Sequence, residues 1–260
     1  MPELKIGIVI AALPAPLRRA FQLAGQSGAD AVEIEAVGPL RPRELSDSGV
    51  RQLRKLIADE GLCVAAVRFP TRRGYNVPED LDARVDATKA AMQLSARLGA
   101  RIVTNHVGRV PEDRDDPAWG VMLEALSDLA AYGQHVGAQL VARTGSETGT
   151  DLARLLDALP SGGVGVDFDP GGLILGGYSP AEAITALGSK ILYVHARDSV
   201  RDLAAGRGVQ VPLGRGSADF PELAGMLEQH QYRGFFTIDP SGGEDPIGEI
   251  SRAVQFLRSL

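Results

Sequence analysis

Four apolar runs in the second half of the chain each stop at a polar residue. The runs AQLVA, GVDF, ILYV and FFTI are followed by Arg143, Asp169, His195 and Asp239. Carboxylates and a neutral imidazole can bind a divalent metal or move protons, whereas an arginine carries only donors and stays charged. Parallel barrels build their active sites from such strand ends. We therefore predict that these four side chains converge on one mouth.

Three residues of this set also have a purely structural interpretation. Asp169 could cap the Pro-Gly-Gly turn that follows it, Asp239 could begin a loop, and His195 could be a satisfied core residue. We favour the functional interpretation because all three occupy equivalent strand ends, and Asp198 is near enough in sequence to orient His195. The candidate catalytic residues are Asp239, His195 and Arg143, and the candidate metal ligands are Asp169, His195 and Asp239.

Polar residues elsewhere are candidate contacts for a ligand. His106 ends RIVTNH, Glu33 lies in VEIE, Arg68 and Arg72 lie around FPTRRGYN, and Arg215 lies in PLGRGSADF. Guanidinium groups can bind a carboxylate, a phosphate or sugar hydroxyls. The alternatives are that His106 only ties down the next loop, that Glu33 pairs with an arginine, and that the arginine segment is a solvated loop.

Alternating strands and helices must position these side chains. Strand-like runs occur near 4–10, 31–36, 62–67, 101–106, 138–143, 163–168, 190–195 and 234–239, and helical spacing is clear over 81–98 and 117–132. Pro117, Gly99 and the Ser179-Pro180 pair are typical helix boundaries. Eight strands without a linker predict a single-domain α/β (β/α)₈ TIM barrel over residues 1–260, with an irregular loop at 199–218 over its mouth. Neither a completed G-x-G-x-x-G nor a P-loop is present.

Composition narrows the class of protein. The chain has 260 residues, 44% of them hydrophobic, so it can bury a sizeable core. Its 27 basic and 33 acidic side chains give a net charge of −6, which argues against nucleic acid as a partner. The single cysteine, Cys63, lies inside LCVAAV, and we expect a core residue in a reducing compartment. No apolar run approaches a membrane span of about 20 residues, so we expect a cytoplasmic protein without membrane partners.

Several motifs together resemble a known family. These are DFDPGGLILGG, VHARD, VPLGRGSADF and GFFTID, supported by LGARIVTNHVG. The chain is similar, over nearly its whole length, to the xylose isomerase-like TIM barrel superfamily, the sugar-phosphate isomerase/epimerase and apurinic-endonuclease group. The resemblance implies a glutamate, an aspartate, a histidine and a second glutamate at the ends of strands five to eight. In relatives these four hold a divalent metal, and the two glutamates move a proton between neighbouring carbons of a sugar.

This sequence departs from that pattern at the positions of both glutamates. Asp169 and His195 match, but Arg143 stands at the first glutamate and Asp239 at the second, and Gly172 replaces a residue that is often Asn or His. Arginine cannot act as a base, and aspartate is one methylene shorter than glutamate, so two-base epimerisation is disfavoured.

The position of Arg143 leaves two hypotheses for the metal. In the first, its planar fork pairs with carboxylates and replaces the metal, which predicts weak or absent metal binding. In the second, Arg143 swings outward and leaves Asp169, His195 and Asp239 as ligands for Mn²⁺, Mg²⁺ or Zn²⁺, with Glu147 as a replacement oxygen.

We therefore predict a sugar isomerase/epimerase-type barrel that acts on or binds a small sugar-like molecule, with Asp239 as the remaining base and Arg143 holding an enolate oxygen. The alternative is a non-catalytic sugar-binding or regulatory barrel whose metal site is replaced by Arg143. An endonuclease is a poor third candidate because of the acidic balance. The resemblance is compatible with a homo-oligomer.

Overall fold

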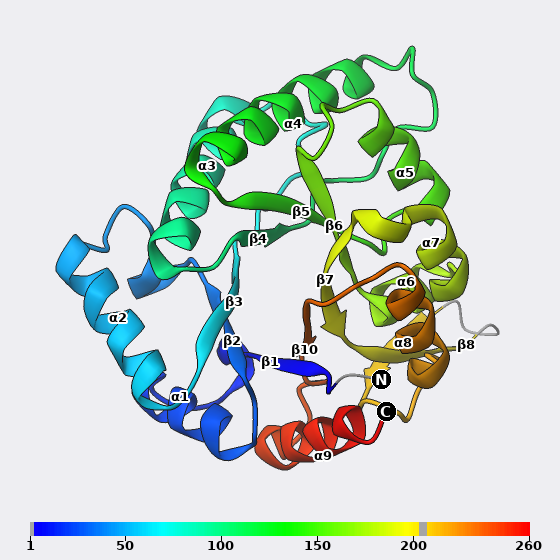
Figure 1. Ribbon diagram of the computed structural model, residues 1–260. Helices are drawn as coiled ribbons and strands as arrows, with labels where there is room; N and C mark the ends of the chain where they lie inside the picture. The colour runs from blue at the N-terminus through cyan, green and yellow to red at the C-terminus, as the bar shows by residue number, and fades with distance from the viewer. Residues whose placement is uncertain (1–2, 203–206) are drawn as a thin grey trace.

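The structure, a computed structural model, describes residues 3–202 and 207–260. Within these ranges, eight parallel strands close into a barrel in the order β1-β10-β7-β6-β5-β4-β3-β2, and helices surround it (Figure 1). The barrel strands are β1 Lys5–Val9, β2 Ala31–Glu35, β3 Cys63–Arg68, β4 Ile102–Asn105, β5 Gln139–Arg143, β6 Val164–Phe168, β7 Ile191–Ala196 and β10 Phe235–Ile238. The predicted TIM barrel is confirmed.

The helices occupy the intervals between the strands. They are α1 Leu17–Gln26, α2 Asp47–Asp59, α3 Leu81–Leu98, α4 Pro117–Val136, α5 Gly149–Asp157, α6 Pro170–Gly176, α7 Pro180–Leu187, α8 Phe220–Gln229 and α9 Pro246–Arg258, with short 3₁₀ turns at Ile10–Ala12, Gly38–Leu40 and Gly188–Lys190. Their boundaries follow local chemistry: Gly99 ends α3 at a φ of 85°, and the Ser179 side chain caps α7. No helix among the described residues is long and apolar enough to cross a membrane.

Two hydrophobic regions hold the barrel together. The larger one lies between the strands and the helices and includes Phe21, Trp119 and Leu126. The smaller one, with Tyr193 and Val141, belongs to residues that alternate into the barrel. Together they keep the strand ends, and hence the side chains at the mouth, in fixed positions.

The seam between β1 and β10 closes the barrel. Lys5 pairs with Phe235 and Ile8 with Ile238 across it. Arg258 of α9 crosses the same region, where its guanidinium donates to the carbonyl of Leu4 and, at 2.9 Å, to a carboxylate oxygen of Asp30. The first and last elements of the fold are therefore joined directly.

Two expectations from the sequence are corrected here. Part of the stretch expected to be irregular, 199–218, forms an antiparallel hairpin of β8 Asp198–Asp202 and β9 Arg207–Val211, while 203–206 lie outside the described residues. The hairpin packs mainly against α6. Cys63 is exposed instead of buried, because it is the first residue of β3 and lies at the amino end of the strand, beyond the packed middle.

Candidate functional site

Four adjacent strands bring the predicted residues to one end of the barrel. Arg143 ends β5, Asp169 follows β6, His195 lies near the end of β7, and Asp239 follows β10. These strands are consecutive in the barrel order. Because side chains alternate along a strand, residues two positions apart share the inner face, so Asp167 and Asp169 form successive levels of the same wall.

The lower level is a buried ion-pair cluster of Arg143, Asp167, His195 and Glu33. Arg143 Nε donates to Asp167 Oδ2 at 2.9 Å, and the other Asp167 oxygen lies 2.7 Å from His195 Nδ1. His195 Nε2 lies 3.0 Å from Glu33 Oε2. The His195, Asp167 and Glu33 side chains are fully buried, and Arg143 is 4% exposed. Both ring nitrogens of His195 therefore face carboxylates.

Mutual attraction keeps this cluster charged. Burial and Arg143 lower the pKa of His195, but Asp167 and Glu33 outweigh them and raise it to about 9. Burial raises the pKa of Asp167, but His195 and Arg143 lower it to about 2, and the same two cations lower the pKa of Glu33 against the effect of burial. At neutral pH two cations therefore balance two anions.

The contact between Arg143 and His195 has a particular consequence. Arg143 Nη2 lies 2.9 Å from Nδ1 and 2.6 Å from Nε2 of the ring. A protonated imidazole has no acceptor nitrogen, so the contact is a close approach of two cations and not a hydrogen bond. The carboxylates of Asp167 and Glu33 hold the two cations together, which makes each member of the cluster dependent on the others.

The upper level is a partly exposed group that we call the mouth cluster: Asp169, Arg197, Asp239, Arg68 and Glu35. Arg197 Nη1 donates to Asp169 Oδ2 at 2.6 Å, and the other Asp169 oxygen caps α6 by accepting from Gly172 N at 2.8 Å. Asp239 Oδ2 lies 3.8 Å from Arg197 Nε and 3.9 Å from Arg68 Nη1. The Asp239 side chain thus faces two guanidinium groups at distances longer than a hydrogen bond.

The donor set does not fit the metal site that the resemblance implies. His195 directs its nitrogens to Asp167 and Glu33, Asp169 binds Arg197, and Asp239 faces two arginines. In the part of the chain that the structure describes, no three His, Cys, Asp or Glu side chains converge on one point. Arg143 has not swung outward, and the second metal hypothesis loses its premise.

The remaining candidate residues lie in three different places. Glu33 belongs to the buried ion-pair cluster, and Arg68 to the mouth cluster. His106, Arg72 and Arg215 are exposed in loops or at a strand end. Although part of its surface is exposed, crowding by neighbouring atoms that displaces water, and the charge of Arg143, lower the pKa of His106 to about 4, which favours the neutral ring at pH 7.

Glu147, the suggested replacement oxygen, is outside both clusters. It is 5% exposed, and its Oε2 accepts from the backbone N–H of Val110 at 3.2 Å. Burial raises its pKa to about 7.

Sequence reasoning missed two residues of the mouth. Arg197 follows His195 by two positions and therefore shares its inward face, a period-two signal that was present in VHARD. Gln210, in β9, accepts from Arg197 and donates to the backbone carbonyl of Asp239. No local pattern marks Gln210, because its contacts depend on how the hairpin folds back.

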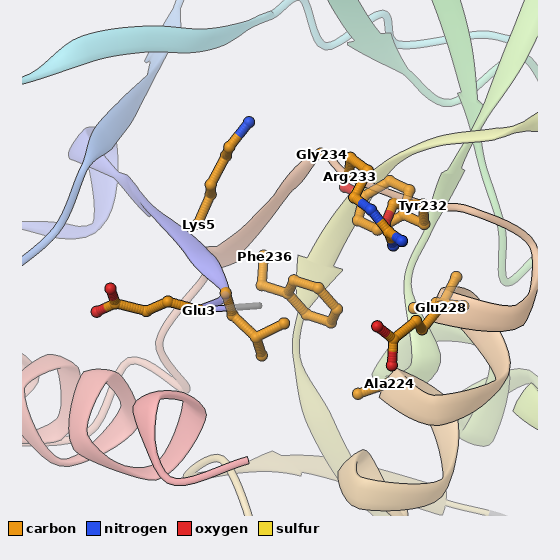
Figure 2. Close-up of a pocket in the computed structure, with 10 residues that line it drawn as sticks. Glu3, Lys5, Ala224, Glu228, Tyr232, Arg233, Gly234 and Phe236 are labelled. Carbon is orange, nitrogen blue, oxygen red and sulfur yellow. The ribbon is translucent and has the colours of Figure 1, made fainter. Parts of the chain in front are cut away.

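A separate cavity of about 100 Å³ lies at the opposite end of the barrel, between the start of β1, β10 and α8 (Figure 2). Leu4, Leu227 and Phe236 give it an apolar lining. It shares no residue with the mouth cluster, so the chemistry predicted from the strand ends does not involve it.

Comparison with solved structures supports the same fold. A xylose isomerase domain protein from Planctomyces limnophilus is 21% identical, with a TM-score of 0.87 over 99% of this chain and 97% of that one. A xylose isomerase-like TIM barrel protein from Mycobacterium smegmatis in complex with magnesium is 18% identical, with a TM-score of 0.78 over 99% and 95%. A D-psicose 3-epimerase in the presence of D-fructose is 16% identical, with a TM-score of 0.77 over 98% and 97%.

Curated relatives match over a shorter length. The inosose dehydratase of Geobacillus kaustophilus is 27% identical over 160 residues, 53% of this chain and 51% of that protein. The chain thus spans about half the length of this relative. The model of the family described as xylose isomerase-like TIM barrel matches residues 21–260. With the closed barrel and the strand-end site, this match shows that the chain belongs to the xylose isomerase-like TIM barrel family.

Proposed function

We propose that the mouth cluster binds a small polyhydroxylated ketone or sugar, and that Asp239 removes a proton from the carbon next to its carbonyl. This makes the protein a sugar isomerase/epimerase-type enzyme with altered catalytic residues. The family's sugar-modifying members and the inosose dehydratase relatives support the substrate class. The reaction class follows from the residues of the mouth.

The geometry of Asp239 is the observation that carries the proposal. Its side chain is 17% exposed, and the nearest described cations lie at 3.8 and 3.9 Å. A carboxylate at the mouth without a short ion pair keeps its lone pairs available to a substrate proton. Asp169, by contrast, is 1% exposed at its side chain and binds Arg197 at 2.6 Å.

The proton transfer involves few groups. The substrate C–H bond breaks, its proton passes to Asp239, and the electron pair forms an enolate whose oxygen Arg197 stabilises. Return of the proton to the former carbonyl carbon isomerises the sugar when the hydroxyl proton of the neighbouring carbon passes to the former carbonyl oxygen. Departure of a hydroxyl group with that proton, as water, dehydrates it. Each outcome needs one carboxylate base, the role that we assign to Asp239; the other partly exposed carboxylate of the mouth cluster, Glu35, lies closer to a cation, at 3.6 Å from Arg68 Nε.

Arg197 takes the role that sequence reasoning gave to Arg143. Arg143 is buried, and its described contacts are with Asp167 and His195. Arg197 is 18% exposed at its side chain and lies between Asp169 and Asp239. We assign the enolate oxygen to Arg197, and to Arg143 the position of a fixed internal cation that takes the place of the metal.

Deuterium exchange tests the proposal. Purified protein treated with EDTA is incubated in D₂O with 2-keto-myo-inositol, D-fructose or D-psicose, and exchange at the carbon next to the carbonyl is followed by NMR. We expect exchange in one of these probes, its loss in Asp239→Asn, and its retention in Asp245→Asn, a change on the exposed N-cap of α9. Exchange that survives Asp239→Asn would exclude Asp239 as the base.

A non-catalytic sugar-binding barrel is the second candidate. It is favoured by the cation Arg143 at a strand end where relatives are expected to carry a base. The same experiment separates the two, because saturation-transfer NMR detects binding of a probe without exchange. Exchange by the native chain would rule this candidate out.

A further inference from the structure

One side chain of the β8–β9 hairpin joins two residues of the mouth cluster. Gln210 Oε1 accepts from Arg197 Nε at 3.2 Å and from Arg197 Nη2 at 2.8 Å. Gln210 Nε2 donates to the backbone carbonyl of Asp239 at 2.8 Å. The ends of β7 and β10 are thus bridged by a residue from outside the barrel.

The hairpin that carries Gln210 is itself held firmly. The buried Asp198 carboxylate accepts from the backbone N–H groups of Ser199, Gly214, Gly216 and Ala218, at 2.8 to 3.1 Å. These bonds tie the start of β8 to the segment that follows β9. The hairpin therefore presents its residues to the mouth in one arrangement.

Tight packing against α6 gives the same result from the other side. A Cβ atom on Gly208 of β9 would clash with a methyl group of Leu175, so the Leu175 side chain would have to shift to make room for it. The helix α6 is in turn capped by Asp169, the partner of Arg197. Arg197 is therefore held by groups that the hairpin and α6 fix relative to each other.

We propose that Gln210 is a positioning residue that sets the plane of the Arg197 guanidinium against Asp239 and so orients the carbonyl oxygen of the substrate for proton removal. This inference rests on the proposed function. Of the five Arg197 N–H groups, the hydrogen bonds between described residues use Nε, one on Nη2 and one on Nη1. One N–H on each terminal nitrogen makes no hydrogen bond to a described residue, and we assign these donors to the carbonyl oxygen of the substrate.

Two substitutions at Gln210 and one control separate the contribution of its side-chain oxygen, which accepts from Arg197, from that of its side-chain nitrogen, which donates to Asp239. In Gln210→Met the side chain keeps a similar length and loses the hydrogen bonds to both Arg197 and the Asp239 carbonyl. Gln210→Glu keeps acceptors for Arg197 but loses the donor to the Asp239 carbonyl. Gln255→Met, at an exposed position of α9, is the matched control. Deuterium exchange of 2-keto-myo-inositol reports proton removal, and the Nε–H resonance of Arg197, assigned by its loss in Arg197→Lys, reports the guanidinium directly.

We expect Gln210→Met to lower the exchange rate about a hundredfold, because a displacement near 1 Å costs about that much. The Arg197 Nε–H resonance should broaden through faster exchange with water, Gln210→Glu should restore it, and Gln255→Met should match the native protein. An unchanged resonance and rate in Gln210→Met would overturn the inference. If the resonance is lost in Gln210→Met but the native chain exchanges none of the probes, the positioning role of Gln210 stands and the proposed function is refuted.

Discussion

Removing Arg143 from the buried ion-pair cluster should cost much of the stability of the barrel. Arg143→Met takes away one of two cations and leaves His195 with two carboxylates, Asp167 and Glu33, in a fully buried region. At the 2.9 Å separation of Arg143 Nε and Asp167 Oδ2, Coulomb's law with an effective dielectric of about 20 gives roughly 6 kcal/mol for this attraction. Repulsion from His195, whose Nε2 lies 2.6 Å from Arg143 Nη2, is of similar size, so the net attraction also depends on Asp169 and Glu33, which with Asp167 raise the pKa of Arg143.

The expected net loss is about 3 to 5 kcal/mol, the usual cost of leaving a buried charge without its partner. That is a large part of a typical folding free energy of about 5 to 15 kcal/mol. Urea unfolding at pH 7, followed by circular dichroism, measures it as a lower midpoint at unchanged slope. Arg73→Met is the control, since Arg73 is 53% exposed at its side chain and lies 3.8 Å from Glu79, and should change stability by less than about 0.5 kcal/mol.

A second substitution makes the test specific to charge. Asp167→Asn added to Arg143→Met restores a balance of one cation and one anion, so the double variant should be more stable than the sum of the single losses by about 2 kcal/mol or more. A loss below about 1 kcal/mol in Arg143→Met, or additive losses in the double variant, would refute the coupled cluster.

Three further outcomes follow from individual buried groups. The pKa of His195 is raised to about 9 from 6.5, so protonated His195 should stabilise the folded protein by roughly 3 kcal/mol below pH 6.5, and this contribution should be lost as pH rises through 9. Urea unfolding midpoints measured across this pH range check the prediction, and His195→Gln should lack this pH dependence. The pKa of Glu147 is raised to about 7 from 4.5, so its charged form at pH 8 destabilises the fold, and Glu147→Gln should stabilise the protein by roughly 1 to 3 kcal/mol at pH 8 but not at pH 4. Thermal unfolding at the two pH values measures this difference, and equal effects at both would contradict it. Asp198→Ala removes the acceptor of four backbone N–H groups, so it should lower the free energy of unfolding by about 3 kcal/mol and speed amide hydrogen exchange at Gly214 and Gly216. Unchanged exchange at these two residues would mean that the loop is ordered without Asp198.

The barrel could be predicted because its strands and helices are marked by patterns of consecutive residues in the sequence. The predicted helix 81–98 coincides with α3, because its apolar spacing and the terminal Gly99 are properties of consecutive residues. The strands agree within about a residue at most ends for the same reason. Asp169 and Asp239 reached the mouth as predicted because the carboxyl ends of parallel strands meet on one face.

The side-chain contacts of the site could not be predicted from patterns of neighbouring residues in the sequence. His195 contacts Glu33, from a strand at the far side of the sequence, and this depends on the barrel register. Arg143 was expected to face the mouth, but its hydrogen bond to Asp167 holds it in the lower level. The hairpin was missed because β9 is short and largely exposed, so that its apolar residues Val209 and Val211 form no buried face, and its pairing with β8 depends on Asp198 and on α6.

The seam between β1 and β10 has a consequence for folding kinetics. Its contacts join residues near opposite ends of the sequence, so they carry the largest loop-closure entropy in the barrel and are expected to form late. Interactions formed after the main barrier slow unfolding without speeding folding. The bonds of Arg258 to Leu4 and Asp30 lie at this seam. We therefore expect these bonds to lower the unfolding rate of the barrel and to leave its folding rate unchanged.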